Sequence, residues 1–302
     1  MKEQLNRLDT EQRNPASAHI DTMTTEEMVR LINTEDHRCA EAVEKVLPEI
    51  ARSVDLIEGQ LKKGGRLFYA GAGTSGRLGV LDAAECPPTY GVDPGMVVGL
   101  IAGGPSAFLK AVEGAEDSPE LGRQDLMAHG FCGKDALVGI AASGRTPYVI
   151  GAMDYAREQG APVMALTCCR DSAMSRHADV TMAPIPGPEV VTGSSRMKSG
   201  TCQKLVLNTL STCVMVKMGK VYGNLMVDVQ ATNQKLVNRA IRIVCSATGA
   251  GEPEAEAALK QCGFACKTAI VMILLGVGRE EAERLLTEAD GRIAAAVEKK
   301  GN

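Results

Sequence analysis

The chain has 302 residues, a formal net charge of −4, only 3% aromatic residues and no tryptophan. Its length is sufficient for one large core with additional helices around it. The slightly negative charge argues against a nucleic-acid partner, and the few aromatic side chains argue against a binder that stacks bases or sugars. No signal-peptide core and no charge-free run of membrane-spanning length are present, so we expect a cytoplasmic protein without a membrane partner.

The ten cysteines are scattered along the chain and include no Cys-x-x-Cys pair. None of the four histidines completes a zinc-like cluster with them. We expect reduced, mostly buried cysteines. The sequence implies neither a metal nor a cofactor.

The N-terminal part predicts an irregular arm followed by helices. Residues 9–23 show no clear periodicity. Thr24 and Glu27 form a capping-box pattern ahead of a short helix. A second helix is expected from about 35 to 63, where Pro48 could kink it.

From residue 66 onward, short apolar runs alternate with helical segments, which is typical of a parallel sheet covered on both faces. The fold class is therefore α/β, a five-stranded parallel sheet flanked by helices with a small C-terminal helical bundle. The expected strands are 66–70, 96–101, 136–141, 162–167 and 179–182. The expected helices are 75–86, 105–115, 119–129, 146–159, 172–177 and 205–217 around the sheet, then 236–248, 252–262, 265–276, 279–286 and 290–299 in the bundle.

The most informative stretch is the turn Gly71–Gly76 after the first strand. Its glycines allow a ligand to approach the backbone, and the helix start presents unpaired N–H groups to an anion. Thr74 and Ser75 add hydroxyl donors, which suits a phosphate. The Gly-x-Gly-x-x-Gly spacing also occurs in dinucleotide folds, but the second strand ends in Gly103-Gly104-Pro105 without the ribose-binding acid. A monophosphate is favoured over a dinucleotide, and a glycine-rich turn without ligand is the other alternative.

Two further polar loops belong to the same sheet. Ser143 and Thr146 follow the strand 136–141 at a helix start, and two hydroxyl loops after parallel strands predict two sides of one phosphate pocket. A third segment, 187–204, is dense in polar residues and includes cations suited to anionic groups; a helix cap with ordinary surface charges is its alternative. The candidate phosphate- and sugar-binding residues are Thr74, Ser75, Ser143, Thr146, Ser194, Ser195, Arg196 and Lys198.

Carboxylates that could transfer protons occur in two places. Glu85 is expected in the last turn of the helix that the two prolines 87–88 end, where a negative charge opposes the helix dipole. Glu113, Glu116 and Asp117 form an acidic cluster ahead of another helix, and the residues alone do not choose among them. One of these paired with Glu85 would supply an acid and a base for proton transfer at carbon, and solvated surface acids are the alternative.

Together these residues resemble the N-acetylmuramic acid 6-phosphate etherase family, within the sugar isomerase (SIS) phosphosugar-binding superfamily. The segment 187–204 looks like the signature shared with glucokinase regulatory proteins, from which Ser199 and Cys202 depart slightly. The other motifs that carry the resemblance are 10–15, 72–79, 82–89, 113–117 and 224–230.

The resemblance implies a lyase that cleaves the lactyl ether of N-acetylmuramic acid 6-phosphate, giving N-acetylglucosamine 6-phosphate and D-lactate in peptidoglycan recycling. It also implies a homodimer, with an N-terminal arm and helices at 1–57, a SIS phosphosugar-binding domain at 58–235 and a helical subdomain at 236–302. By motif match the catalytic glutamates fall on Glu85, as the acid that protonates the departing lactate, and Glu116, as the base at C2. A non-catalytic sugar-phosphate-binding regulator and a phosphosugar isomerase are the alternatives.

Overall fold

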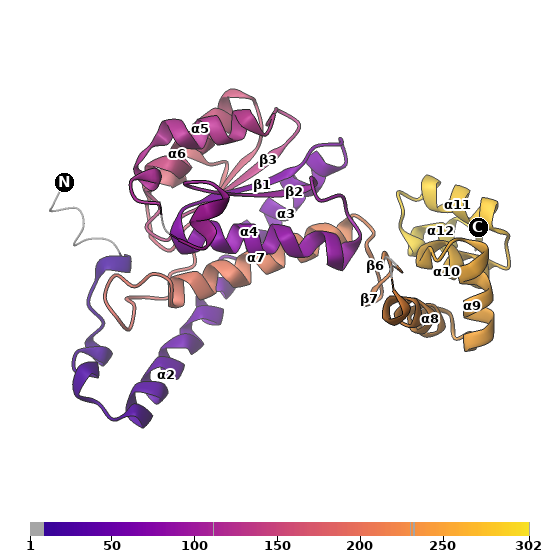
Figure 1. The fold of residues 1–302 in the computed structure, drawn as a ribbon, viewed down its shortest axis with the longest axis horizontal. Coiled ribbons are helices and arrows are strands. Elements are labelled where there is room, and N and C mark those ends of the chain that lie inside the picture. The colour runs from indigo at the N-terminus through magenta and orange to yellow at the C-terminus, as the bar shows by residue number, and fades with distance from the viewer. Residues whose placement is uncertain (1–8, 111, 230, 232, 302) are drawn as a thin grey trace. The chain divides into compact units, whose positions relative to one another are not determined.

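The computed structural model describes residues 9–110, 112–229, 231 and 233–301 (Figure 1). These residues form two compact units. The first holds the described part of Met1–Ala84 and Gly95–Ser211, and the second holds Glu85–Pro94 and the described part of Thr212–Asn302. The predicted division at residues 57 and 235 stays a prediction.

The first unit is built on the predicted five-stranded parallel sheet. In chain order its strands are β1 (Leu67–Gly71), β2 (Val97–Ile101), β3 (Ala136–Ile140), β4 (Val163–Leu166) and β5 (Val180–Met182). They stand in the order β2-β1-β3-β4-β5. Gly71 pairs with Ile101 of β2 and with Ile140 of β3. The loops that leave these three strands therefore begin side by side at the carboxyl edge of the sheet.

Helices cover both faces of the sheet (Figure 1). The long helices that lie or begin in this unit are α2 (Thr25–Glu44), α3 (Leu47–Leu61), α4 (Gly73–Tyr90), α5 (Pro119–Ala128), α6 (Pro147–Glu158) and α7 (Lys198–Lys217). Helix α6 packs so closely on one face that a Cβ on Gly139 would lie 2.8 Å from the Met153 sulfur. Helix α4 packs on the other face, where a Cβ on Gly79 would lie 2.9 Å from the Cβ of Tyr69. This double burial explains the continuous apolar strands of the sequence.

The N-terminal helices break at a different place from the prediction. Helix α2 continues past residue 35, and the break falls at residues 45–46, before α3. Pro48 accounts for the position, because its ring would clash with the carbonyl group of Glu44 in a continuous helix. Proline is well tolerated in the first turn of a new helix, which is where Pro48 lies.

Helix α4 does not end at Pro87 and Pro88 as we expected but continues through them to Tyr90. The prolines remove two N–H donors from the helix, yet the N–H group of Gly91 still donates to the carbonyl oxygen of Pro87 at 2.9 Å and closes the last turn. Glu85 thus lies inside the helix rather than in its last turn. The expected conflict with the helix dipole is correspondingly weaker, because that effect is confined to the terminal turn.

Two other helices of the first unit also differ from the prediction. The described residues of 105–115 include the short 3₁₀ turn η4 (Pro105–Phe108) and the start of another, η5 (Ala115–Asp117), in place of the predicted helix. Gly114, just before η5, has a positive φ of 74°. Helix α7 begins at Lys198, a full turn and more before the expected start at residue 205. The remaining short 3₁₀ turns are η1 (Asp9–Glu11), η2 (Pro15–Ser17), η3 (Ile20–Thr22) and η6 (Ala173–His177).

The second unit is a small helical bundle, as the tail of the sequence predicted, and it also holds a two-stranded hairpin that was not predicted. Its elements are β6 (Val221–Tyr222), β7 (Leu225–Met226), α8 (Gln234–Thr248), α9 (Glu252–Gln261), α10 (Cys266–Leu275), α11 (Arg279–Glu288) and α12 (Ile293–Gly301). Asp228, after the hairpin, accepts from Lys220 and Lys267, both at 2.8 Å, and so ties the hairpin to α10. Gln230, the last residue of the 224–230 motif, lies outside the described residues.

Within the part of the chain that the structure describes, no single helix is long and apolar enough to cross a membrane. Helices α9 and α10, which are bent by 117° at their break, pass that test of length and composition only as a pair. Their buried side chains belong to the core of the bundle.

Candidate functional site

The candidate site begins where β1 runs into α4, at the carboxyl edge of the sheet. Gly71 and Gly76 lie so close that a Cβ on Gly76 would be 2.7 Å from the carbonyl oxygen of Gly71. Only glycine permits this approach, which brings the first turn of α4 directly over the end of the strand. The unpaired N–H groups of that turn favour an anion.

A cavity of about 280 Å³ adjoins the start of α4. Its lining combines Ala72 and Gly73 of the turn with Glu113 and Glu116, whose side chains are exposed. Arg77 also lines it and donates to the carbonyl oxygen of Phe108 at 2.7 Å, which fixes the loop after β2. An anion-binding helix start and two carboxylates therefore face one space within the first unit. This is the combination that proton transfer on a phosphorylated substrate requires.

The two hydroxyl residues of α4 link this turn to the third polar segment. Ser75 is 8% exposed, and its Oγ donates to Oε1 of Gln203 at 3.0 Å. Thr74 is half-buried and lies beside Gly200, where an added Cβ would be 3.4 Å from its methyl group. The starts of α4 and α7 thus lie side by side (Figure 1).

The second loop leaves β3 at Ile140, the register partner of Gly71. Ser143 and Thr146 of this loop are half-buried, and Thr146 is the N-cap of α6 without a side-chain hydrogen bond to that helix. Gly144 has a φ of 63°, and a Cβ there would lie 2.3 Å from the Cβ of Ser172. The loop therefore holds a shape that only glycine allows, at the same edge as the first loop but not on the lining of the 280 Å³ cavity.

The third segment divides into an open part and a buried part. Ser194 and Ser195 are half-buried and Arg196 is exposed. Lys198 is fully buried, with its Nζ 2.5 Å from Oε2 of Glu35 and 3.2 Å from the carbonyl oxygen of Pro186. Its ammonium group faces protein, so its geometry is that of a residue that holds the segment in place rather than one that contacts a ligand.

Two buried carboxylates organise this segment, and the sequence analysis missed both. Glu189 accepts from the backbone N–H groups of Lys198 and Ser199, both at 2.9 Å, and so already occupies the N-terminus of α7. Glu35 accepts from Lys198 and from Nδ2 of Asn14, the latter at 2.8 Å. Burial alone would raise the pKa of Glu35, but Lys198 and Asn14 hold that pKa below its ordinary value. The 10–15 motif thus has a structural purpose, because Asn14 connects the N-terminal arm to this network.

The acids on α4 differ in their surroundings. Asp82 is buried and accepts from the Tyr69 hydroxyl group at 2.9 Å and from the Ser211 hydroxyl group at 3.0 Å; burial raises its pKa. Glu85 is exposed, on the segment Glu85–Pro94 that belongs to the second unit. Asp82 therefore serves packing, whereas the carboxylate of Glu85 is accessible.

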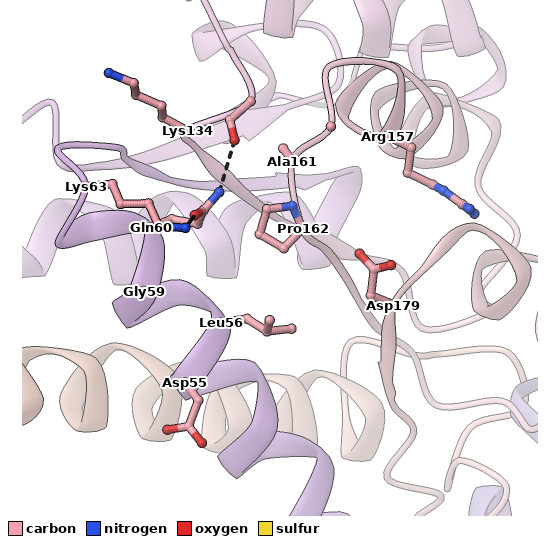
Figure 2. Close-up of a pocket in the computed structure, with 12 residues that line it drawn as sticks. Asp55, Leu56, Gly59, Gln60, Lys63, Lys134, Arg157, Ala161, Pro162 and Asp179 are labelled. Carbon is pink, nitrogen blue, oxygen red and sulfur yellow. Dashed lines mark hydrogen bonds between the residues drawn. The ribbon is translucent and has the colours of Figure 1, made fainter.

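A larger cavity, of about 630 Å³, lies at the opposite, amino edge of the sheet (Figure 2). It is lined by Gln60 and Lys63 at the end of α3, by Arg157 near the end of α6, and by Lys134 and Asp179 from loops that precede strands. In Figure 2 the side chains of Lys134 and Arg157 extend away from each other. The helix end beside it is a C-terminus, which disfavours an anion. Ligands of open parallel sheets bind beyond the carboxyl ends of the strands, so we place the candidate site at the smaller cavity.

No group of three or more His, Cys, Asp or Glu side chains among the described residues is arranged to hold a metal ion. The polar groups gathered at the carboxyl edge include hydroxyls, amides, carboxylates, helix N–H groups and the guanidinium group of Arg77. Their chemistry is binding of an anion and transfer of protons.

Comparison with known proteins gives consistent matches. A family model described as the glucokinase regulatory protein N-terminal SIS domain matches residues 49–157, and a SIS domain model matches residues 132–213. The chain is 60% identical over 293 residues to the N-acetylmuramic acid 6-phosphate etherase of Serratia proteamaculans, covering 97% of this chain and 99% of that protein. It is 59% identical over 297 residues to the enzyme of the same name from Photorhabdus laumondii, covering 98% and 99%.

The solved structure of a phosphoheptose isomerase from Neisseria gonorrhoeae aligns with a TM-score of 0.51 and 22% identity. The alignment covers 63% of this chain and 98% of that one. This likeness concerns the fold, which is shared by the sheet and its flanking helices.

Proposed function

Since the chain belongs to the N-acetylmuramic acid 6-phosphate etherase family, we propose that it is a carbon–oxygen lyase that cleaves the lactyl ether of N-acetylmuramic acid 6-phosphate. Water is consumed, and the products are N-acetylglucosamine 6-phosphate and D-lactate, a step of amino-sugar catabolism in peptidoglycan recycling. One observation carries the assignment of this chemistry to a site: Glu116 and the start of α4 line the same cavity.

We assign the two proton transfers to Glu116 and Glu85. In the ring-opened sugar the aldehyde at C1 acidifies the C2 proton, which Glu116 removes as a base. The released electron pair forms the C2–C3 double bond while the C3–O bond breaks, and Glu85 protonates the departing lactate oxygen. Water then adds at C3 and C2 regains a proton. The exposure of both carboxylates supports this assignment, because each must reach substrate.

The phosphate of the substrate is assigned to the start of α4 and the loop after β3. The donors are the N–H groups of the α4 turn and the hydroxyl groups of Thr74, Ser75, Ser143 and Thr146. Ser194, Ser195 and Arg196 are assigned to the sugar and to the lactyl carboxylate. Lys198 is not assigned to the ligand, because its ammonium group is bound to Glu35. We propose instead that it positions the third segment.

We further propose that the protein works in the cytoplasm as a homodimer. All ten cysteines are free and seven are buried, which suits a reducing compartment.

The proposed homodimer is supported by a group of exposed apolar side chains after β2, namely Phe108, Leu109 (90% exposed) and Val112. A second copy of the chain could cover them. Sedimentation equilibrium of the purified protein tests this, and a monomer at micromolar concentration would contradict it.

Incubation of the purified protein with N-acetylmuramic acid 6-phosphate tests the proposed reaction. We expect D-lactate and N-acetylglucosamine 6-phosphate in equal amounts. A non-catalytic regulator would bind the substrate without releasing lactate, and a phosphosugar isomerase would convert an aldose to a ketose without releasing it. Absence of lactate from folded protein would contradict the etherase assignment.

A further inference from the structure

Gln203 is a buried polar side chain to which the proposed reaction assigns no role. It lies in the second turn of α7 and is 1% exposed. Its Oε1 accepts from Ser75 Oγ at 3.0 Å, while its Nε2 has no hydrogen-bond partner among the described residues. A buried amide donor without a partner is costly, and such groups call for an explanation.

The direction of the Ser75–Gln203 hydrogen bond matters for phosphate binding. A phosphate accepts hydrogen bonds and donates few or none, so Ser75 must offer its own proton to bind one. In the present arrangement that proton is directed to Oε1 of Gln203. The hydroxyl group therefore cannot serve the amide oxygen and a phosphate at the same time.

A half-turn of the Gln203 amide resolves this conflict. The carbonyl and amino ends of an amide are nearly the same size, so the rotation places Nε2 where Oε1 was without changing the packing. The amide then donates to Ser75 Oγ, and the Ser75 proton becomes free. The serine oxygen keeps one hydrogen bond from Gln203 and gives one to the ligand.

We propose that Gln203 is a positioning residue that turns Ser75 into a phosphate donor by donating Nε2–H to its Oγ in the ligand-bound state. The proposal rests on the assignment of Ser75 to the substrate phosphate. Gln203 acts through Ser75 and does not touch the substrate, since its Nε2 is buried.

Three variants test this role by their KM for N-acetylmuramic acid 6-phosphate. Gln203→Met removes the donor, and we expect KM to rise about tenfold, with kcat changed less. Gln203→Glu keeps the shape but only accepts when ionised, so KM should rise further. The ratio of its KM to that of the wild type should fall as the pH is lowered towards 5, because a protonated carboxyl group can donate to Ser75. Gln124→Glu on α5, whose amide donates to Glu120 on the surface, is the matched control and should leave KM unchanged.

A double-mutant cycle separates positioning from general structure. If Gln203 acts through Ser75, Gln203→Met should have no further effect in a Ser75→Ala background. Additive effects, an unchanged KM in Gln203→Met, or a pH-independent KM ratio in Gln203→Glu would each overturn the proposal. If Gln203→Met does not fold, the pH profile of Gln203→Glu alone decides.

Binding of N-acetylglucosamine 6-phosphate, measured by calorimetry without turnover, distinguishes this proposal from the function on which it rests. Wild-type binding that Gln203→Met weakens about tenfold supports the role. Wild-type binding that Gln203→Met leaves intact overturns only the role of Gln203. If the wild type binds N-acetylglucosamine as tightly as N-acetylglucosamine 6-phosphate, both the phosphate site and the role of Gln203 are overturned.

Discussion

The two edges of the sheet carry cavities of different size and chemistry. The amino edge has the larger cavity, about 630 Å³, lined by lysine, arginine and aspartate side chains around the end of α3. The carboxyl edge has a cavity of about 280 Å³ lined by the start of α4 and by Glu113 and Glu116. Helix starts at one edge favour anions and helix ends at the other disfavour them. The polarity of the helices, more than the volume of the cavity, therefore identifies the functional edge.

The strongest test of this comparison is removal of the proposed base at the carboxyl edge. Glu116→Gln should lower kcat for lactate release by about 10²–10⁴-fold, the usual contribution of a general base. Glu113→Gln, in the same cavity lining, is the matched control and should lose less. Equal losses of kcat in both variants would show that Glu116 is not the base or that Glu113 and Glu116 share this role.

Glu85→Gln should abolish lactate release for a different reason, because the C3 oxygen then leaves without a proton. Its C2 base would remain, so the variant should still exchange the C2 proton of N-acetylglucosamine 6-phosphate with deuterium from solvent, measured by NMR. Lactate release at the wild-type rate would show that Glu85 is not the acid. If the variant lost both the C2 proton exchange and the lactate release, Glu85 would be the base instead.

Behind the carboxyl edge, removing one partner of the buried Glu35–Lys198 pair should cost the most stability. Glu35→Gln leaves the buried ammonium group of Lys198 without its charge partner, and we expect a loss of about 3–5 kcal/mol in the free energy of unfolding, measured in urea. Glu35→Met with Lys198→Met should recover much of this loss, because neither charge of the buried pair remains. Glu26→Gln breaks an exposed pair with Arg30 and, as the control, should cost about 1 kcal/mol or less.

The same carboxylate makes stability depend on pH. The pKa of Glu35 is lower in the folded protein than its ordinary value, so the folded state binds this proton more weakly than the unfolded state. The stabilisation is complete above the ordinary pKa of glutamate and is lost as the pH falls through the folded pKa. Unfolding free energies measured between neutral pH and pH 3 should therefore decline more steeply for the wild type than for Glu35→Gln.

The parts of the first unit that local sequence patterns could predict are those made by neighbouring residues. The Thr24 capping box is one, with the N–H group of Thr24 donating to the carboxylate of Glu27 at 2.7 Å. The five strands and the glycine–hydroxyl turn at 71–76 are others, since apolar runs and glycines act within a few residues. Glu35 and Lys198 lie 163 positions apart. No local pattern joins them, so the sequence analysis took Lys198 for a cation that binds the ligand.

The prolines of the N-terminal helices and of α4 behave differently: Pro48 accompanies a helix break, whereas the predicted stop at Pro87 and Pro88 was wrong. Pro48 moved the helix break to the residues before it, as its clash with the preceding turn requires. Pro87 and Pro88 were tolerated inside α4. The last turn of α4 still closes, because the N–H group of Gly91 donates to the carbonyl oxygen of Pro87.

Loss of a phosphate donor should have a smaller effect than loss of a catalytic glutamate. Ser75→Ala and Ser143→Ala should each weaken substrate binding by about 1–3 kcal/mol, the value of a hydrogen bond to a charged group. The effect should appear in KM, and it should be absent for binding of a sugar without phosphate. Unchanged KM in both variants would remove the two-loop phosphate pocket from the proposal.

The smallest expected effect lies at the amino edge and completes the comparison. Lys134→Ala removes an exposed cation from the larger cavity, and we expect kcat and KM to stay within about twofold of the wild type, since an exposed charge far from the reaction contributes little. Arg196→Ala, which removes an exposed cation from the third segment, is the matched variant and should raise KM. If the Lys134 variant instead lost substrate affinity and the Arg196 variant did not, cavity volume would be the better guide to this protein, and the site would have to be moved to the amino edge.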